Sequence, residues 1–241
     1  MRFLAHRGAP KLAPENTLPS FARALSLGMR EFELDVHLTS DGRLVVHHDF
    51  TLSHTAQTPV VIKEMDFDSL SRLNVGAYFP GAEPVRIPLL SEVMALLGAS
   101  VSTLNVEVKN EGGTYPGIER RLLDEVNSTG GWEGRILYSS FDHEVLRTIR
   151  SLSPDARLGV LVGKVKIDGA LDTAASLGAE SVHISVRQAG DDSILSAIKN
   201  RGFRTLVYTV NDRDAALSLE KRGVDGVFTD DPSVAFPGAR I

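Results

Sequence analysis

TLVYTVNDRDAALSLEKRGVDGVF, residues 205–228, contains two apolar, strand-like segments, Thr205 to Thr209 and Asp225 to Phe228. Between them Asp212 to Lys221 has a helical pattern, and Gly223 stands where a left-handed helix cap is wanted. A strand, a helix and a second strand in this order are typical of a βα repeat in a parallel sheet.

The same unit recurs along the rest of the chain. Further strands are predicted at residues 2–6, 31–38, 103–109, 136–138, 158–161 and 181–184, and further helices at 17–27, 118–128, 142–152, 167–177 and 191–200. Eight strands with seven or eight helices favour an α/β fold, the (β/α)8 TIM barrel. A doubly wound open sheet is the alternative, but no glycine-rich dinucleotide turn follows any of the strands.

One stretch interrupts the repeat. About fifty residues separate the second strand from a helix near residues 89–97, and they include a short extra strand at Leu44 to Val46. We expect one domain over residues 1–241, with an insert at about 50–88. A position after strand two places the insert on the catalytic face of a barrel, where it would shape substrate choice.

The composition excludes several classes of protein. The net charge is −5, which does not favour nucleic acid. The absence of cysteine excludes disulfides and thiolate metal ligands. Because no leader of signal-peptide length and no apolar run of ~18 residues is visible, we expect a cytoplasmic protein without stable membrane insertion. The sequence leaves the oligomeric state open, a homo-oligomer included.

Two predicted strands alternate acidic and apolar residues. Glu33 and Asp35 share one face of the first, and Glu107 shares a face of the second with Asn105 and Lys109. If the strands are neighbours, these carboxylates crowd together, and two carboxylates about 4 Å apart repel by roughly 4 kcal/mol at an effective dielectric near 20. A hard divalent cation would remove that repulsion. The other interpretation is an ion-pair network with Lys109 inside the barrel.

Histidines follow two of the apolar segments. His6-Arg7-Gly8 ends the first strand, and His47-His48-Asp49 follows the extra strand. A histidine at a strand end suits acid–base catalysis, although each motif alone is weak evidence. The remaining histidines are expected to be structural or exposed, with His183 a candidate for the lumen: His37, His54, His143 and His183. Glu31 is expected to be exposed at a strand entrance, and Glu15 to be a helix-start charge.

The motifs occur together and in a specific order. They are His6-Arg7-Gly8, Pro14-Glu15-Asn16-Thr17, Glu33-Leu34-Asp35-Val36, Thr39-Ser40-Asp41-Gly42, Val45-Val46-His47-His48-Asp49 and Glu107-Val108-Lys109. Ser139-Ser140-Phe141-Asp142, Tyr208-Thr209-Val210-Asn211 and Val224 to Pro232 continue the pattern. In this order the motifs closely resemble the glycerophosphodiester phosphodiesterase family, over nearly all of the chain.

The resemblance implies a distorted barrel with a small insert after strand two. It implies that Glu33, Asp35 and Glu107 hold a divalent metal cation, Mg or Ca. His6 and His48 would be the general base and acid. The phosphate-binding residues would be Arg7 and Lys109, and Tyr208, where many members carry tryptophan, would contact the substrate at the far side of the pocket.

The expected activity is hydrolysis of a small-molecule phosphodiester to glycerol 3-phosphate and an alcohol. The alternatives are a lysophospholipase D-type enzyme that cleaves lipids and a metal-stabilised binding module without turnover. The attacking group is open between water and the 2-hydroxyl of the glycerol.

Overall fold

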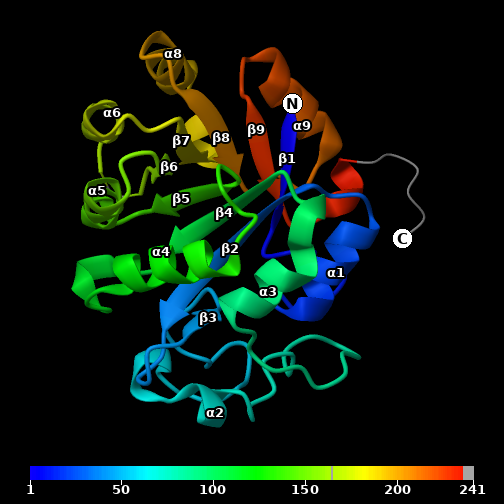
Figure 1. Cartoon of the computed structure of the whole chain (residues 1–241). Coiled ribbons are helices and arrows are strands. Elements are labelled where there is room, and N and C mark those ends of the chain that lie inside the picture. The colour runs from blue at the N-terminus through cyan, green and yellow to red at the C-terminus, as the bar shows by residue number, and fades with distance from the viewer. Residues whose placement is uncertain (164, 236–241) are drawn as a thin grey trace.

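A closed parallel barrel forms the body of the protein in the computed structural model, which describes residues 1–163 and 165–235 (Figure 1). The barrel strands are β1 (Arg2–His6), β2 (Glu31–Leu38), β4 (Thr103–Val108), β5 (Ile136–Ser140), β6 (Arg157–Leu161), β7 (Ser181–Ser185), β8 (Arg204–Tyr208) and β9 (Gly226–Thr229). Each pairs in parallel with its neighbour, and β1 pairs with both β2 and β9. This closure confirms the TIM barrel and excludes the open sheet.

Helices pack around the outside of the strands (Figure 1). They are α1 (Leu18–Ser26), α3 (Leu90–Leu97), α4 (Ile118–Thr129), α5 (His143–Leu152), α6 (Ile167–Leu177), α7 (Val186–Ala189), α8 (Asp192–Asn200) and α9 (Arg213–Lys221). Thr17 caps the start of α1, and Gly178 ends α6 in the left-handed conformation, as their positions predict. Within the described residues, no helix has both the length and the apolar character needed to cross a membrane.

The strands divide their side chains between two sides. On β2, Phe32, Leu34 and Val36 join the main core between sheet and helices. A smaller cluster, Leu4, Leu137, Leu206 and Phe228, fills part of the barrel interior. Polar side chains of β2 and β4 are therefore left at the open end of the lumen.

The insert packs on its own small core beside the antiparallel strand β3 (Leu44–Val46). It contains α2 (Phe67–Leu70), and Val45, Leu52, Ile62, Leu70, Val75 and Ile87 form its buried cluster. In Figure 1 this segment lies below β3, away from most of the helices. The contacts give the insert a structure of its own and attach it to the barrel along β3.

Candidate active site

Register alone brings the three acidic residues together. β2 and β4 are adjacent, with Asp35 opposite Glu107 and Glu33 opposite Asn105. Glu33, Asp35 and Glu107 are all buried, and each offers a carboxylate oxygen within 4.8 Å of the others. The expected clustering of these side chains is confirmed.

Two cations enter the same cluster. Lys109 Nζ lies 3.1 Å from Asp35 Oδ1 and also pairs with Glu107. Arg7 Nε lies 3.4 Å from the other oxygen of Asp35. Burial opposes ionisation of Asp35, but Lys109 and Arg7 outweigh it and hold the pKa of this carboxyl well below its ordinary value. The ion-pair network that the sequence offered as an alternative is therefore present, centred on Asp35.

Of the three carboxylates, Glu33 is the one that forms no ion pair with Lys109 or with the Arg7 side chain. Its Oε2 accepts a hydrogen bond from the Arg7 backbone amide at 3.1 Å, and its buried Oε1 has no hydrogen-bond partner among the described residues. Burial, followed by the charges of Asp35 and Glu107, raises the pKa of Glu33 well above its ordinary value. A buried oxygen without a donor, beside two other carboxylates, fits the oxygen-only ligands that Mg²⁺ and Ca²⁺ prefer.

The loop after β1 holds Arg7 in a strained conformation. Arg7 has a φ of 55°, which is uncommon for a residue with a side chain. Gly8 follows, and a Cβ there would lie 2.5 Å from Ser20 Oγ, so the loop packs against the start of α1 only with glycine. The Ser20 hydroxyl donates to the Arg7 carbonyl at 3.0 Å. This packing directs Arg7 towards Asp35.

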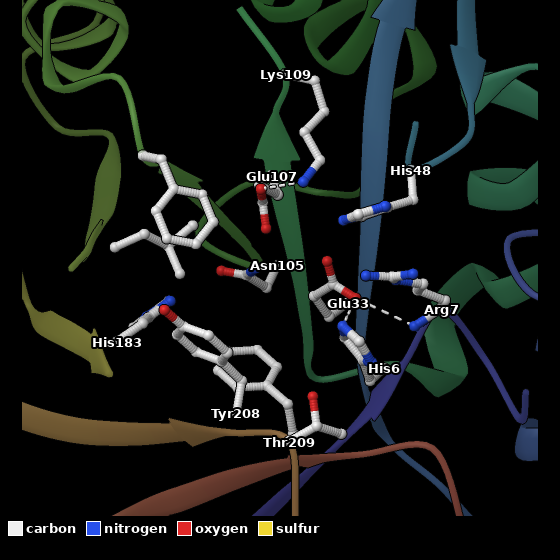
Figure 2. Close-up of a pocket in the computed structure, with 13 residues that line it drawn as sticks. His6, Arg7, Glu33, His48, Asn105, Glu107, Lys109, His183, Tyr208 and Thr209 are labelled. Atoms are coloured by element: carbon white, nitrogen blue, oxygen red, sulfur yellow. Dashed lines mark hydrogen bonds and ion pairs between the residues drawn. The ribbon is translucent and has the colours of Figure 1, made fainter. Parts of the chain in front are cut away.

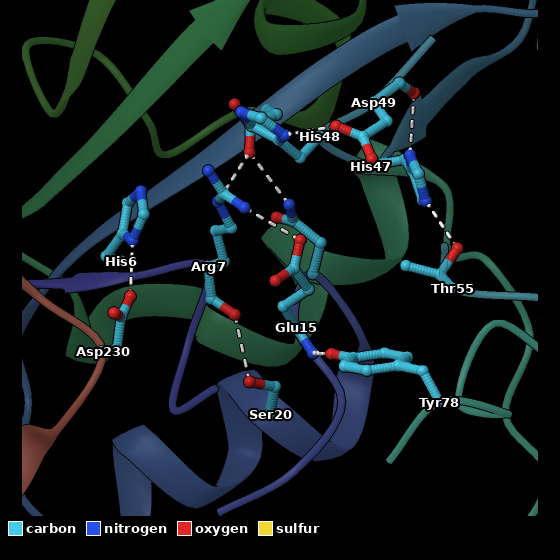
Figure 3. Close-up of polar contacts among 12 residues, drawn as sticks. His6, Arg7, Glu15, Ser20, His47, His48, Asp49, Thr55, Tyr78 and Asp230 are labelled. Atoms are coloured by element: carbon cyan, nitrogen blue, oxygen red, sulfur yellow. Dashed lines mark hydrogen bonds and ion pairs between the residues drawn. The ribbon is translucent and has the colours of Figure 1, made fainter. Parts of the chain in front are cut away.

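His6 is oriented by an acid from the far end of the chain. Its Nδ1 lies 2.6 Å from Asp230 Oδ1 (Figure 3). Asn211 donates to the other oxygen of Asp230 at 2.7 Å. Because a carboxylate can only accept, Nδ1 carries a proton, and Nε2 lies 3.9 Å from Glu33 Oε2. Asp230 was not predicted as a site residue, although it belongs to the last of the family-like motifs.

His48 has the same arrangement with a local partner. Its Nδ1 lies 2.8 Å from Asp49 Oδ1, and its side chain lines the cavity. Burial first, then the positive charges of Lys109 and Arg7, lowers the pKa of His48. His6 and His48 both present Nε2 to the cavity.

Two further histidines hold the loop that carries His48. His37 Nε2 lies 3.1 Å from the His48 carbonyl, and its Nδ1 lies 2.8 Å from the Tyr115 hydroxyl. His47 Nδ1 lies 2.9 Å from the Asp49 carbonyl, and its Nε2 lies 2.9 Å from Thr55 Oγ1 (Figure 3). Burial, reinforced by His47, lowers the pKa of His37 to about 3, so this imidazole is neutral. His37 is structural, as expected.

These side chains surround a cavity of about 140 Å³ that is open to solvent (Figure 2). Its lining comprises His6, Arg7, Glu33, His48, Asn105, Glu107, Lys109, Phe141, Leu161, His183, Tyr208, Thr209 and Phe228. Tyr208 packs edge-on against Phe141, and its hydroxyl donates to the Val162 carbonyl at 3.2 Å. His183 faces the lumen, which the alternation on its strand allowed.

Two expectations, those for Glu15 and Glu31, need correction, and the influence of the insert on substrate choice stays a prediction. Glu15 is more than a helix-start charge, because its carboxylate accepts from Arg7 Nη1 at 2.9 Å. Glu31 is half-buried in an ion pair with Arg2 at 2.7 Å rather than exposed. No residue of the insert, residues 50–88, lines the cavity. The insert instead reaches the site through Thr55 and through Tyr78, whose hydroxyl accepts from the Glu15 amide at 2.9 Å.

Asn16 is a further residue whose role the motif alone did not reveal. Its amide donates to Asp35 Oδ2 at 2.9 Å, while the neighbouring Thr17 caps α1. Its φ of 54° is one that asparagine tolerates better than most residues.

The chain is similar in sequence to known proteins over nearly its whole length. The model of the glycerophosphoryl diester phosphodiesterase family matches residues 6–234. The chain is 34% identical over 230 residues to a glycerophosphodiester phosphodiesterase of Caldanaerobacter subterraneus, covering 95% of this chain and 93% of that protein. It is 35% identical over 239 residues to one of Bacillus altitudinis, covering 97% and 96%.

Solved structures give the same result. A phosphodiesterase of Oleispira antarctica in complex with the product sn-glycerol-3-phosphate superposes with a TM-score of 0.80 at 28% identity, covering 96% of this chain and 94% of that one. A glycerophosphodiester phosphodiesterase of Agrobacterium tumefaciens superposes with a TM-score of 0.81 at 25% identity, covering 97% and 98%. With a family match from His6 to the turn after the last barrel strand, the chain belongs to the glycerophosphoryl diester phosphodiesterase family.

Proposed function

We propose that this protein hydrolyses glycerophosphodiesters to glycerol 3-phosphate and an alcohol, with a divalent cation held by Glu33, Asp35 and Glu107. The observation that carries the proposal is the buried carboxylate cluster between two aspartate-held histidines. The product named in the Oleispira antarctica complex supports the same chemistry.

The cation would act as a Lewis acid on a phosphoryl oxygen. Arg7 and Lys109 line the cavity and offer positive charge to the other phosphoryl oxygens, where negative charge grows in the transition state. Neither Arg7 nor Lys109 titrates near neutral pH, because the surrounding carboxylates outweigh burial and raise the pKa of each side chain.

The two histidines would each move one proton in the reaction. His6 Nε2, with Nδ1 bound to Asp230, would remove the proton of the attacking hydroxyl. His48 Nε2, with Nδ1 bound to Asp49, would protonate the departing alkoxide. Each transfer is typically worth about 10²–10⁴-fold in rate.

The test is a turnover panel of glycerophosphocholine, glycerophosphoethanolamine and a 1-acyl lysophospholipid, with Mg²⁺, Ca²⁺ or excess chelator. We expect the two soluble diesters to be cleaved with metal and not with chelator. Glu33→Gln should weaken metal binding, measured by calorimetry, and leave the circular dichroism spectrum unchanged. Turnover in excess chelator would contradict the metal role. Turnover of the lysolipid alone would indicate the lysophospholipase D-type activity, and metal binding without turnover the binding module.

A further inference from the structure

Two buried polar atoms of the cavity lack a partner on the side away from the catalytic histidines. Asn105 Oδ1 and His183 Nδ1 are both buried, and neither has a hydrogen-bond partner among residues 1–163 and 165–235. Both residues line the cavity and are at most 1% exposed. Figure 2 shows the Asn105 amide and the His183 imidazole on the side of the pocket opposite His6, Arg7 and His48. Unpaired buried polar atoms are rare in native proteins, and each calls for a partner such as a bound ligand, an ion or a water.

Each group is fixed by its other polar atom. Asn105 Nδ2 donates to Ser139 Oγ at 3.0 Å, which leaves the amide oxygen as the free end. His183 Nε2 lies 2.9 Å from Ser181 Oγ. Gly159 makes room for this ring, because a Cβ there would lie 2.5 Å from His183 Nε2. The two free atoms are therefore held in place before any ligand arrives.

The chemistry of this wall is neutral. Burial lowers the pKa of His183 to about 3, so the imidazole carries no charge near neutral pH. Phe228 packs against it with ring centroids 5.2 Å apart. A phosphate would bind at Arg7 and Lys109 instead, because this wall supplies no positive charge. An alcohol fits, since its hydroxyl can donate to Asn105 Oδ1 and accept from His183 Nδ1–H when Ser181 donates to Nε2.

We propose that Asn105 and His183 form a hydroxyl-binding subsite for the terminal hydroxyl of the substrate's glycerol, the one farthest from phosphorus. This inference rests on the proposed function and narrows it. Glycerophosphodiesters with a free terminal hydroxyl fill the subsite. A 1-acyl lysophospholipid has an ester at that position, cannot donate to Asn105 and is rejected.

The first test uses the unaltered protein. Glycerophosphocholine is compared with its 1-deoxy analogue, in which the terminal hydroxyl is replaced by hydrogen. A pocket built to bind a hydroxyl rejects the analogue that lacks it, so kcat/KM should fall by about 10²-fold or more. Calorimetric titration with glycerol 3-phosphate and with 1,2-propanediol 1-phosphate should show the same preference in binding. Equal values for the two compounds would overturn the subsite while leaving the proposed function intact; no turnover of either diester would count against the proposed function.

Substitutions then test whether Asn105 and His183 cause the preference for the natural diester. Asn105→Leu and His183→Leu should each reduce the preference for the natural diester at least tenfold, through loss on that diester alone. Tyr138→Phe is the matched control, because this buried hydroxyl is on the neighbouring strand β5 but belongs to the core between sheet and helices. Metal affinity, measured by calorimetry, should be unchanged in His183→Leu. The assignment to Asn105 and His183 would be refuted if both folded variants kept the preference for the natural diester. It would also be refuted if metal affinity fell together with that preference.

Discussion

The two catalytic histidine candidates are held by different kinds of structure. His6 lies on the barrel where β1 meets β9, and its aspartate partner is 224 residues away in sequence. His48 lies on a loop after β3, and its partner is the next residue. The His6 side chain is 17% exposed and that of His48 is 34% exposed. The same histidine–aspartate contact is thus fixed by tertiary pairing on one side and by local hydrogen bonds on the other.

The difference matters for what each histidine can tolerate. Asp230 is held at both of its oxygens, by His6 and Asn211, on a barrel strand end. The loop of His48 depends on His37 and on His47, which in turn contacts Thr55 of the insert. A substitution at Asp230 or Asn211 should therefore affect His6 alone. A substitution near the loop of His48 should instead be shared among the several hydrogen bonds that hold that loop.

Removing the imidazoles should produce the largest effects. His6→Ala and His48→Ala should each lower kcat by roughly 10²–10⁴-fold, because each removes one proton transfer. The two differ in leaving-group dependence. A glycerol phosphodiester of 4-nitrophenol, whose leaving group needs no proton, should restore turnover in His48→Ala and not in His6→Ala. Rescue of His6→Ala alone would reverse the assignment of acid and base.

The next largest losses of kcat should come from the carboxylates that bind the two histidines, and the two losses should differ in size. Asp230→Asn should lower kcat by about 10²-fold or more, since replacing an orienting carboxylate by an amide favours the wrong tautomer of the histidine. Asp49→Asn should cost about fivefold or less, because its side chain is 47% exposed and exposed ion pairs are worth about 0.2–1 kcal/mol. Asp231→Asn is the control, since Asp231 binds Ser233 and Lys11. Equal losses for Asp230→Asn and Asp49→Asn would remove the distinction between the two supports.

Thr55→Val tests whether the insert acts on the His48 side alone. Losing the bond to His47 should lower kcat by about 2- to 13-fold, as expected for a hydrogen bond worth about 0.5–1.5 kcal/mol. The effect should add to that of Asp230→Asn and add less than fully to that of Asp49→Asn. Thr58→Val is the matched control, because that hydroxyl donates within the insert to the Ala56 carbonyl. Full additivity with both variants would show that Thr55 does not act through this loop.

Tyr78→Phe should have the smallest effect. It tests the barrel side of the comparison, near His6 and Arg7, rather than the loop of His48. The Tyr78 hydroxyl accepts from the Glu15 amide, next to the ion pair of Glu15 with Arg7. We expect a loss of about 0.5–1.5 kcal/mol in the free energy of unfolding, measured with urea, and a higher KM at unchanged kcat. Tyr138→Phe again serves as control. A lower kcat with an unchanged KM would show that Tyr78 acts through the loop of His48 instead.

The sequence predicted the barrel and the acidic cluster because both follow from short-period patterns. Alternation on β2 and β4 determines which face Glu33, Asp35 and Glu107 occupy, and parallel pairing brings the faces together. The role of each site residue remains a prediction, as does the single domain over residues 1–241, and residues 164 and 236–241 lie outside the described part. Contacts between distant segments, such as His6 with Asp230, have no local pattern, and neither has the insert's attachment through Thr55 and Tyr78.

The pairing of β1 with β9 also bears on how the protein folds. Because the barrel closes between its first and last strands, the contact that orients His6 spans almost the whole chain and has a high loop-closure entropy. Helices and neighbouring βα units can form from local contacts before this seam does. During synthesis, a ribosome-bound chain lacking β9 would have the three clustered carboxylates and both histidines but not the aspartate that orients His6. Activity would therefore report the final closure of the barrel, and on refolding from urea it should return later than the helical circular dichroism signal.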